Sequence, residues 1–164
     1  MATRRYWLMK SEPDVYSIED LKREQRCYWE GIRNYQARNF MRDAMQIDDL
    51  AFFYHSNAKP PGIVGVMRIV SEAYPDPTQF DPKSQYFDPK SEEKSPRWSM
   101  IDVAFVEQLP RQVTLNELRD SEDELQGLLA IRKGQRLSIQ PVEADHFQVI
   151  LGMGGSSLNP RRSS

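Results

Sequence analysis

Short apolar runs, each stopped by a polar or proline-containing turn, constrain most strongly what this chain can fold into. Their aromatic and β-branched side chains are typical of buried strands. Six segments share this character and are predicted to be strands: residues 5–9, 27–32, 50–56, 63–73, 97–109 and 136–142. The last of them is expected to be stopped by Pro141. They are too short to cross a membrane, because a transmembrane helix needs about 20 consecutive apolar residues.

Helical patterns lie between these strands. Ser17 is a good helix N-cap, and Ala37 and Met41 fall four residues apart on a helix that starts near Asn34. Further helices are predicted over 114–120 and 121–131, which both start with a capping-box pattern, and over 143–154. Since helices and strands do not alternate regularly, we predict an α+β fold: a mixed β pseudo-barrel with flanking helices.

The chain of 164 residues suits one domain, which we place at residues 1–153. Residues 154–164 have no core-forming pattern and are predicted to be a disordered tail. Residues 74–97 hold five of the eleven prolines, and the sequence FDPKS occurs there twice. This stretch is predicted to be a long surface loop with two related turns, and a loop of that length is commonly functional.

Composition excludes several function classes. The net charge of −2 argues against a protein that coats nucleic acid through bulk positive charge, although it allows a grip on one base and a few phosphates. The single cysteine, Cys27, allows no intrachain disulfide, and with only two histidines no Cys/His zinc site can form. The sequence contains no phosphate-binding glycine loop and no hydrolase motif, so we expect no metal and no cofactor.

The stretch RNYQARNF, residues 33–40, concentrates guanidinium groups, amides and rings. Arginine offers a fixed fork of donors to phosphate, and asparagine can read a base edge. Aromatic rings stack on unpaired bases for roughly 1–3 kcal/mol per base. With Ala37 and Met41 facing the core, Asn34 and Arg38 share an outward face. The pattern alone fits a nucleotide pocket and a solvated helix face equally well.

Polar side chains also follow two predicted strands. Lys10 and Ser11 lie at the end of the first predicted strand, and Tyr54, His55 and Ser56 at the end of the strand over 50–56. For Lys10 and Ser11, a solvent-facing turn is an equally ordinary interpretation. His55 alone is more typical of a structural histidine, although three hydrogen-bonding side chains at a strand end can line a pocket. The default interpretation of Trp7, Trp29 and Trp98 is core packing, although the last two also suit the rim of a site.

Several longer motifs occur in a characteristic order. They are YWLMKSEPDVYSIEDL (6–21), YWEGIRNYQARNFMRD (28–43), FYHS (53–56), GIVGVMRIV (62–70), DPTQFDPKSQYFDPKS (76–91), PRW (96–98) and RLSIQPV (136–142). Together they resemble the EVE-domain family over about residues 5–152. One departure is Asp48, where relatives usually place glycine; aspartate tolerates turn geometry, so we expect no loss of fold.

The resemblance implies a PUA-like fold, related to readers of RNA and DNA bases such as PUA and YTH domains. It also implies recognition of modified bases, particularly modified cytosines, in DNA or RNA. Carried over to matching positions, it implies a pocket built from Lys10, Ser11, Trp29, Asn34, Arg38, Asn39, Tyr54, His55, Ser56, Trp98 and Ser138.

The resulting hypothesis is a non-catalytic reader. Trp29 or Trp98 stacks on the base, and Asn34 or Asn39, with Ser11 or Ser56, reads its polar edge. Flanking phosphates are contacted by Arg33, Arg38 and Lys10.

Two alternatives stay open: an enzyme acting on a modified nucleotide, with His55 as acid or base beside Glu12, and a protein-interaction module that uses the 74–97 loop. The long basic N-terminal extension of nuclear relatives is missing, which favours a bacterial cytoplasmic protein. A eukaryotic chain would be nuclear.

Overall fold

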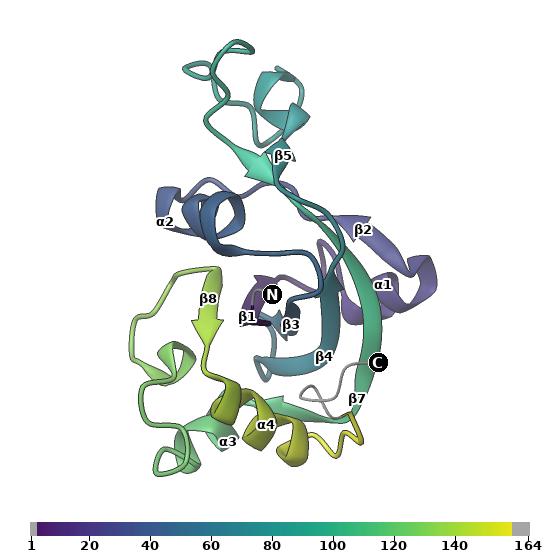
Figure 1. The fold of residues 1–164 in the computed structure, drawn as a ribbon, viewed down its shortest axis with the longest axis vertical. Coiled ribbons are helices and arrows are strands. Elements are labelled where there is room, and N and C mark those ends of the chain that lie inside the picture. Colours follow the sequence, from purple (N-terminus) through teal and green to yellow (C-terminus); the bar gives the residue numbers. More distant parts are fainter. Residues whose placement is uncertain (1–2, 159–164) are drawn as a thin grey trace.

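A mixed six-stranded sheet forms the centre of the computed structural model, which describes residues 3–158 (Figure 1). Its strands are β1 (Tyr6–Ser11), β2 (Arg26–Tyr28), β3 (Leu50–His55), β4 (Gly62–Ile69), β7 (Asp102–Thr114) and β8 (Ile139–Val142), in the order β2-β7-β4-β3-β1-β8. Among these six described strands, β1 and β3 pair in parallel and the other neighbours pair antiparallel. The sheet curls into a half-barrel, which confirms the predicted α+β fold. A second, two-stranded sheet pairs β5 (Tyr74–Pro75) with β6 (Ser99–Met100).

In the described part of the chain, four α-helices flank the sheet: α1 (Ile18–Glu24), α2 (Tyr35–Asn39), α3 (Leu115–Asp120) and α4 (Ala144–Met153). Ser17 caps α1, as predicted, and also forms a capping box with Asp20 that was not predicted. Thr114 closes the capping box that the sequence predicts for α3. No helix within residues 3–158 combines the length and the apolar character needed to cross a bilayer.

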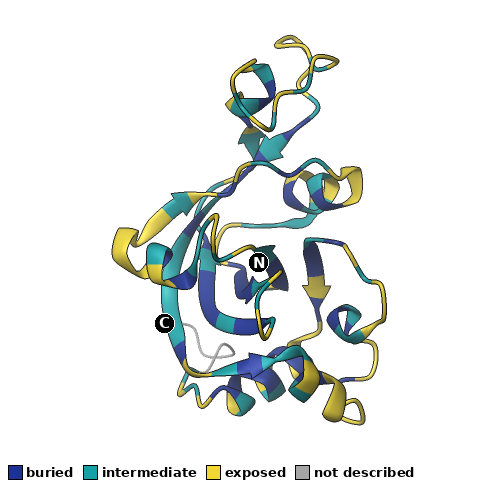
Figure 2. Cartoon of the chain, turned by 180° about the vertical axis from the view of Figure 1, so that it is seen from behind, coloured by how far each residue is buried: buried dark blue, intermediate teal, exposed yellow. Residues whose placement is uncertain are grey.

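The core lies on both faces of the sheet, because side chains alternate along each strand. On β1, Tyr6 and Leu8 face one apolar cluster, whereas Trp7 and Met9 face the other. The first cluster is closed by Phe147 of α4, whose ring stacks on Phe52 with centroids 4.0 Å apart. In Figure 2 the buried residues accordingly concentrate in the strands of the curled sheet.

The helix after Asn34 buries Ala37 and Met41, as predicted. Its second half, Phe40–Ala44, is a π-helix in which the Met45 N–H donates to the Phe40 carbonyl at 2.8 Å. This wider turn takes one residue more than an α-turn. Met45, which follows this turn, is half-buried and packs against the same apolar cluster as Ala37 and Met41.

Two predictions of secondary structure were wrong. Residues 121–131 form turns and a short 3-10 helix, Leu129–Ile131, because Gly127 adopts a left-handed φ of 93° and the chain folds back to bury Leu125 and Leu128. Pro141, predicted to stop its strand, lies inside β8. It is tolerated because β8 is an edge strand, so one side of its backbone needs no ladder partner.

The predicted loop of residues 74–97 projects from one end of the molecule (Figure 1) and carries a 3-10 helix, Pro77–Phe80, near its base. The two predicted related turns are present. Asp81 and Asp88 each accept a hydrogen bond at 2.9 Å from the backbone N–H two residues later. Buried Gln79 holds the ends of the loop together through hydrogen bonds to the backbone of Asp76 and Trp98.

Asp48 adopts a left-handed φ of 78°, which agrees with the expectation that aspartate tolerates this turn. Of the tail predicted to be disordered, residues 154–158 are described. There the Ser156 hydroxyl contacts the Glu107 carboxylate at 2.5 Å, and Leu158 packs against the core. Residues 159–164 lie outside the described part of the chain.

Candidate functional site

A cavity of about 700 Å³ opens between the end of β1, the segment that follows β2, and the projecting loop. We call it the Trp29 cavity. Its lining residues are Lys10, Ser11, Glu12, Val15, Tyr16, Glu24, Arg26, Cys27, Tyr28, Trp29, Glu30, Gly31, Ile32, Tyr86, Asp102 and Ser138. The volume falls within the range of about 300–1,000 Å³ that is usual for ligand sites.

The parallel pairing of β1 with β3 brings two strand ends to one edge of the sheet, with Lys10 beside Tyr54 and Ser11 beside His55. Lys10 and Ser11 line the cavity, whereas Tyr54 is buried. The Lys10 ammonium nitrogen lies over the Tyr54 ring, 5.4 Å from the ring centre. His55 Nε2 accepts a hydrogen bond at 3.1 Å from the backbone N–H of Ile18. Burial lowers the pKa of His55, so it is a neutral acceptor that fixes the start of α1.

Trp29 contributes a largely buried ring to the cavity wall, packed edge to face on Phe53 at 5.4 Å. Two residues later, Gly31 has a φ of 83°, and a Cβ atom there would lie 2.6 Å from the Tyr86 ring. Only glycine fits this close approach and this backbone conformation. The Gly31 N–H donates to Asp76 at 2.8 Å, which draws the projecting loop against the segment after Trp29.

Arg33 joins the same two segments from outside the cavity. Its guanidinium nitrogens all donate within the protein, to Asp76 at 3.2 Å, to the Thr78 hydroxyl at 3.0 Å, and to the carbonyls of Ile32 and Tyr86. Burial alone would raise the pKa of Asp76, but hydrogen bonds from Thr78 and the Gly31 N–H, with the Arg33 charge, outweigh it and lower the pKa. Arg33 is therefore held as a structural cross-link.

Four of the remaining residues of the RNYQARNF stretch group around Trp98, which follows the projecting loop. We call this group the Trp98 cluster: Asn34, Tyr35, Arg38, Asn39 and Trp98. Tyr35 stacks on Trp98 at 4.8 Å, and Arg38 lies 4.7 Å from the Tyr35 ring centre. Asn34 caps α2 by accepting from the Ala37 N–H at 3.0 Å, and Asn39 accepts from Arg38 at 2.8 Å. This cluster joins α2 to the projecting loop.

Of the twelve site residues predicted from sequence, four line the Trp29 cavity: Lys10, Ser11, Trp29 and Ser138. The other eight do not: Arg33, Asn34, Arg38, Asn39, Tyr54, His55, Ser56 and Trp98. The residues that were missed come mainly from the turn after Ser11 and from both sides of Trp29. The sequence signal that could have identified them is that they lie next to predicted site residues. Tyr86, between the two FDPKS turns, has no such neighbour and could not have been predicted as part of the cavity.

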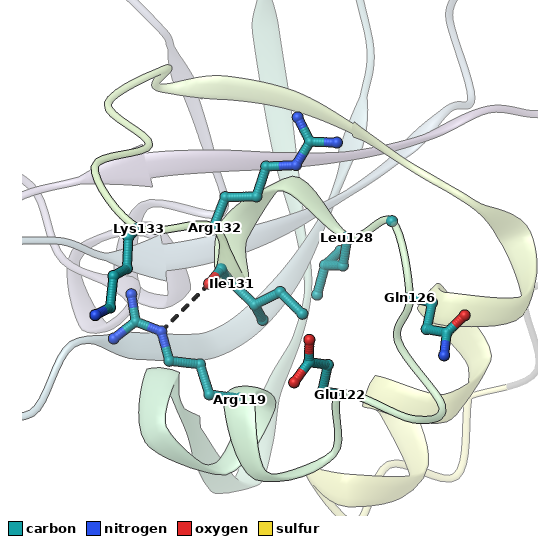
Figure 3. Close-up of a pocket in the computed structure, with 8 residues that line it drawn as sticks. Arg119, Glu122, Gln126, Leu128, Ile131, Arg132 and Lys133 are labelled. Carbon is teal, nitrogen blue, oxygen red and sulfur yellow. Dashed lines mark hydrogen bonds between the residues drawn. The ribbon is translucent and has the colours of Figure 1, made fainter.

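A second cavity, of about 410 Å³, lies between α3 and the loop before β8 (Figure 3). We call it the Arg119 cavity. Its lining includes three cations, Arg119, Arg132 and Lys133, and one acid, Glu122. No ion pair engages these cations within residues 3–158, and Arg119 donates to the Ile131 carbonyl at 3.3 Å. The loop runs on to Gln135, whose carbonyl accepts from the Lys10 ammonium at 3.3 Å, so this hydrogen bond connects the loop to a residue that lines the Trp29 cavity.

Comparisons with known proteins agree on one family. A sequence model of the EVE domain matches residues 5–153. Thymocyte nuclear protein 1 from Mus musculus is 47% identical over 165 residues, covering 90% of this chain and 73% of that protein.

Two solved structures show the same fold. A Pseudomonas syringae protein superimposes with a TM-score of 0.87 at 46% identity, covering 91% of this chain and 99% of that chain. The human THYN1 protein in complex with DNA containing 5-methylcytosine superimposes with a TM-score of 0.86 at 44% identity, covering 94% and 99% of the two chains. These matches over nearly the whole length, together with a PUA-like half-barrel with flanking helices, establish that the chain belongs to the EVE-domain family.

Proposed function

We propose that this chain is a non-catalytic reader that binds modified cytosine in DNA, with the base held in the Trp29 cavity. The observation that carries the proposal is a cavity of ligand size with aromatic and polar walls, in a chain similar to human THYN1, whose structure contains 5-methylcytosine DNA. A base of RNA has the same shape as far as this cavity is concerned. We propose DNA because the structure of the human relative contains DNA. The animal relatives are named as nuclear proteins, which supports a nuclear location if this chain comes from a eukaryote. If it comes from a bacterium, a cytoplasmic location stays a prediction.

The cavity suits a base that has left its stack. Extrusion costs a few kcal/mol, which stacking on an aromatic ring can offset at roughly 1–3 kcal/mol per base. Trp29 and Tyr86 supply rings in the wall, and Tyr28 is 58% exposed at the same cavity. Lys10 and Ser138 place polar groups there for the base edge or the backbone.

The alternatives receive less support. Burial raises the pKa of Cys27 to about 11, so its thiol is protonated near neutrality and is a poor nucleophile. His55 does not line the cavity and is engaged with Ile18. The projecting loop contributes Tyr86 to the cavity wall, which supports a role in the site over a separate protein-binding role.

Filling the cavity provides the direct test. Ser138→Phe places a ring where a half-buried hydroxyl now lines the wall. We expect at least a roughly tenfold loss of affinity for a single-stranded oligonucleotide with one 5-methylcytosine, since stacking and edge contacts are both displaced. Fluorescence anisotropy measures the affinity.

Ser95→Phe, at an exposed position of the projecting loop, is the matched control and should bind as the wild type does. Equal, weak binding of modified and unmodified strands by the wild-type chain would refute the proposal. Mass spectrometry of the recovered oligonucleotide separates a reader, which returns it unchanged, from an enzyme.

Phosphate contacts should come from the neighbouring Arg119 cavity, because the Arg33 guanidinium is engaged within the protein. We expect the double variant Arg132→Ala, Lys133→Ala to bind modified and unmodified strands more weakly by the same factor. The slope of log affinity against log salt should fall by about 0.7 for each lost contact to a single strand. Lys94→Ala, exposed in the projecting loop, is the control. An unchanged salt slope in the double variant would show that the phosphates of the bound strand do not contact Arg132 and Lys133.

A further inference from the structure

Four carboxylate side chains line the Trp29 cavity: Glu12, Glu24, Glu30 and Asp102. Two of them are engaged near the end of β1 and at α1. The Asn57 amide donates to Glu12, and the Tyr16 hydroxyl donates to Glu24 at 2.9 Å. These two carboxylates already have protein donors.

The third, Asp102, accepts from the Tyr74 hydroxyl and pairs with Arg26 at 3.1 Å. Glu30 differs from the other three. Within residues 3–158 its carboxylate takes part in no hydrogen bond or ion pair. Among the four, it is the acceptor left available to a ligand.

The position of Glu30 suits a base edge. It directly follows Trp29, whose ring lines the same cavity, so a base stacked on that wall would present its edge close to this carboxylate. The Glu30 side chain is exposed to solvent on the cavity side of Trp29. Desolvation by the surrounding protein, and next the negative charge of Asp76, raise the pKa of Glu30, while Arg33 opposes them. A carboxylate without an internal donor is free to accept from a donor on the ligand.

We infer that Glu30 is the specificity-determining residue that accepts a hydrogen bond from the 4-amino group of the bound cytosine and rejects thymine. The inference rests on the proposed function. 5-Methylcytosine and thymine share the 5-methyl group, and at position 4 one carries an amino donor and the other a carbonyl acceptor. Carboxylates accept from cytosine N4, whereas the thymine oxygen would face a second acceptor.

The test uses three single-stranded oligonucleotides that differ in one central base, so that no base-pair opening enters the comparison. The bases are 5-methylcytosine, thymine and 5-methylpyrimidin-2-one, which lacks the 4-substituent. We expect the wild-type chain to bind the first roughly tenfold or more tightly than the other two. In Glu30→Gln the preference over thymine should fall to about two- to threefold, because an amide can turn either an oxygen or an NH₂ group toward the base.

Glu19→Gln is the matched control, since Glu19 is exposed on α1, lies outside the cavity and loses the same charge. It should keep the wild-type preference. If a Glu30→Gln variant folds normally by circular dichroism and still prefers 5-methylcytosine over thymine as strongly as the wild type, the inference about Glu30 is wrong, while the proposed function stands. Equal gains in affinity for all three strands in both variants would also overturn it, because they would reflect net charge. A fourth strand with unmodified cytosine tests the proposed function separately, because a wild-type chain that binds it as tightly as the 5-methylcytosine strand would overturn the proposed function itself.

Discussion

Asp76→Ala is expected to lower the free energy of unfolding by about 3–5 kcal/mol, the range found when one partner of a buried ion pair is removed. The Asp76 side chain is fully buried and accepts from the Gly31 N–H, from Arg33 and from both the N–H and the hydroxyl of Thr78. Alanine leaves these donors, including a mostly buried guanidinium, without their acceptor. Urea unfolding followed by tryptophan fluorescence measures the change.

Asp81→Ala is the matched control. Asp81 also fixes a turn of the projecting loop, but it is exposed and its side chain accepts from the Lys83 N–H. Its loss should cost no more than about 1 kcal/mol. A cost for Asp76→Ala that matches the Asp81→Ala value would show that the link between the loop and Gly31 contributes little. Folded Asp76→Ala protein should also bind modified strands more weakly, because that link positions one cavity wall.

Asp49→Ala is expected to have a stability effect of similar size, about 3–5 kcal/mol, with a different cause. Asp49 is 1% exposed and accepts hydrogen bonds from the Arg5 N–H at 3.0 Å, the Trp7 indole at 3.0 Å and the Gln46 N–H at 2.9 Å. Each buried donor left unpaired costs about 1–3 kcal/mol, reduced where water can enter. Thermal and urea unfolding should agree on the loss.

Two variants calibrate this result. Asp49→Asn keeps an acceptor oxygen and should fall between alanine and the wild type. Asp43→Ala removes an exposed aspartate paired with Arg42 and should change stability by less than about 1 kcal/mol. If Asp49→Ala is as mild as Asp43→Ala, the three donors must find other acceptors or water.

The sheet could be predicted because its signal is local. Runs such as residues 50–56 are apolar enough that only a buried strand accommodates them, and the strand Leu50–His55 matches. The helix predicted over 121–131 failed because a capping pattern at Ser121 does not reveal the left-handed conformation of Gly127. Nor does it reveal the tertiary burial of Leu125 and Leu128.

The cavity was only partly predictable. Lys10 and Ser11 could be predicted because they end a strand, and strand ends gather at one edge of a sheet. Arg33 could not, because a guanidinium fork fits a phosphate and a carboxylate equally well. The choice is made by Asp76, forty-three residues along the chain, which only the fold brings within 3.2 Å.

The place of β1 in the sheet has a consequence for synthesis. The strand lies between β3 and β8, and Tyr6 pairs with Val142. A nascent chain therefore carries the bare edge of β1 until residues 139–142 have left the ribosome. Contacts of such long sequence separation slow folding and leave edges open to aggregation. Among the strands of this sheet, β1 is thus made first but is among the last to be fully paired, because the sheet closes only after residues 139–142 have been translated.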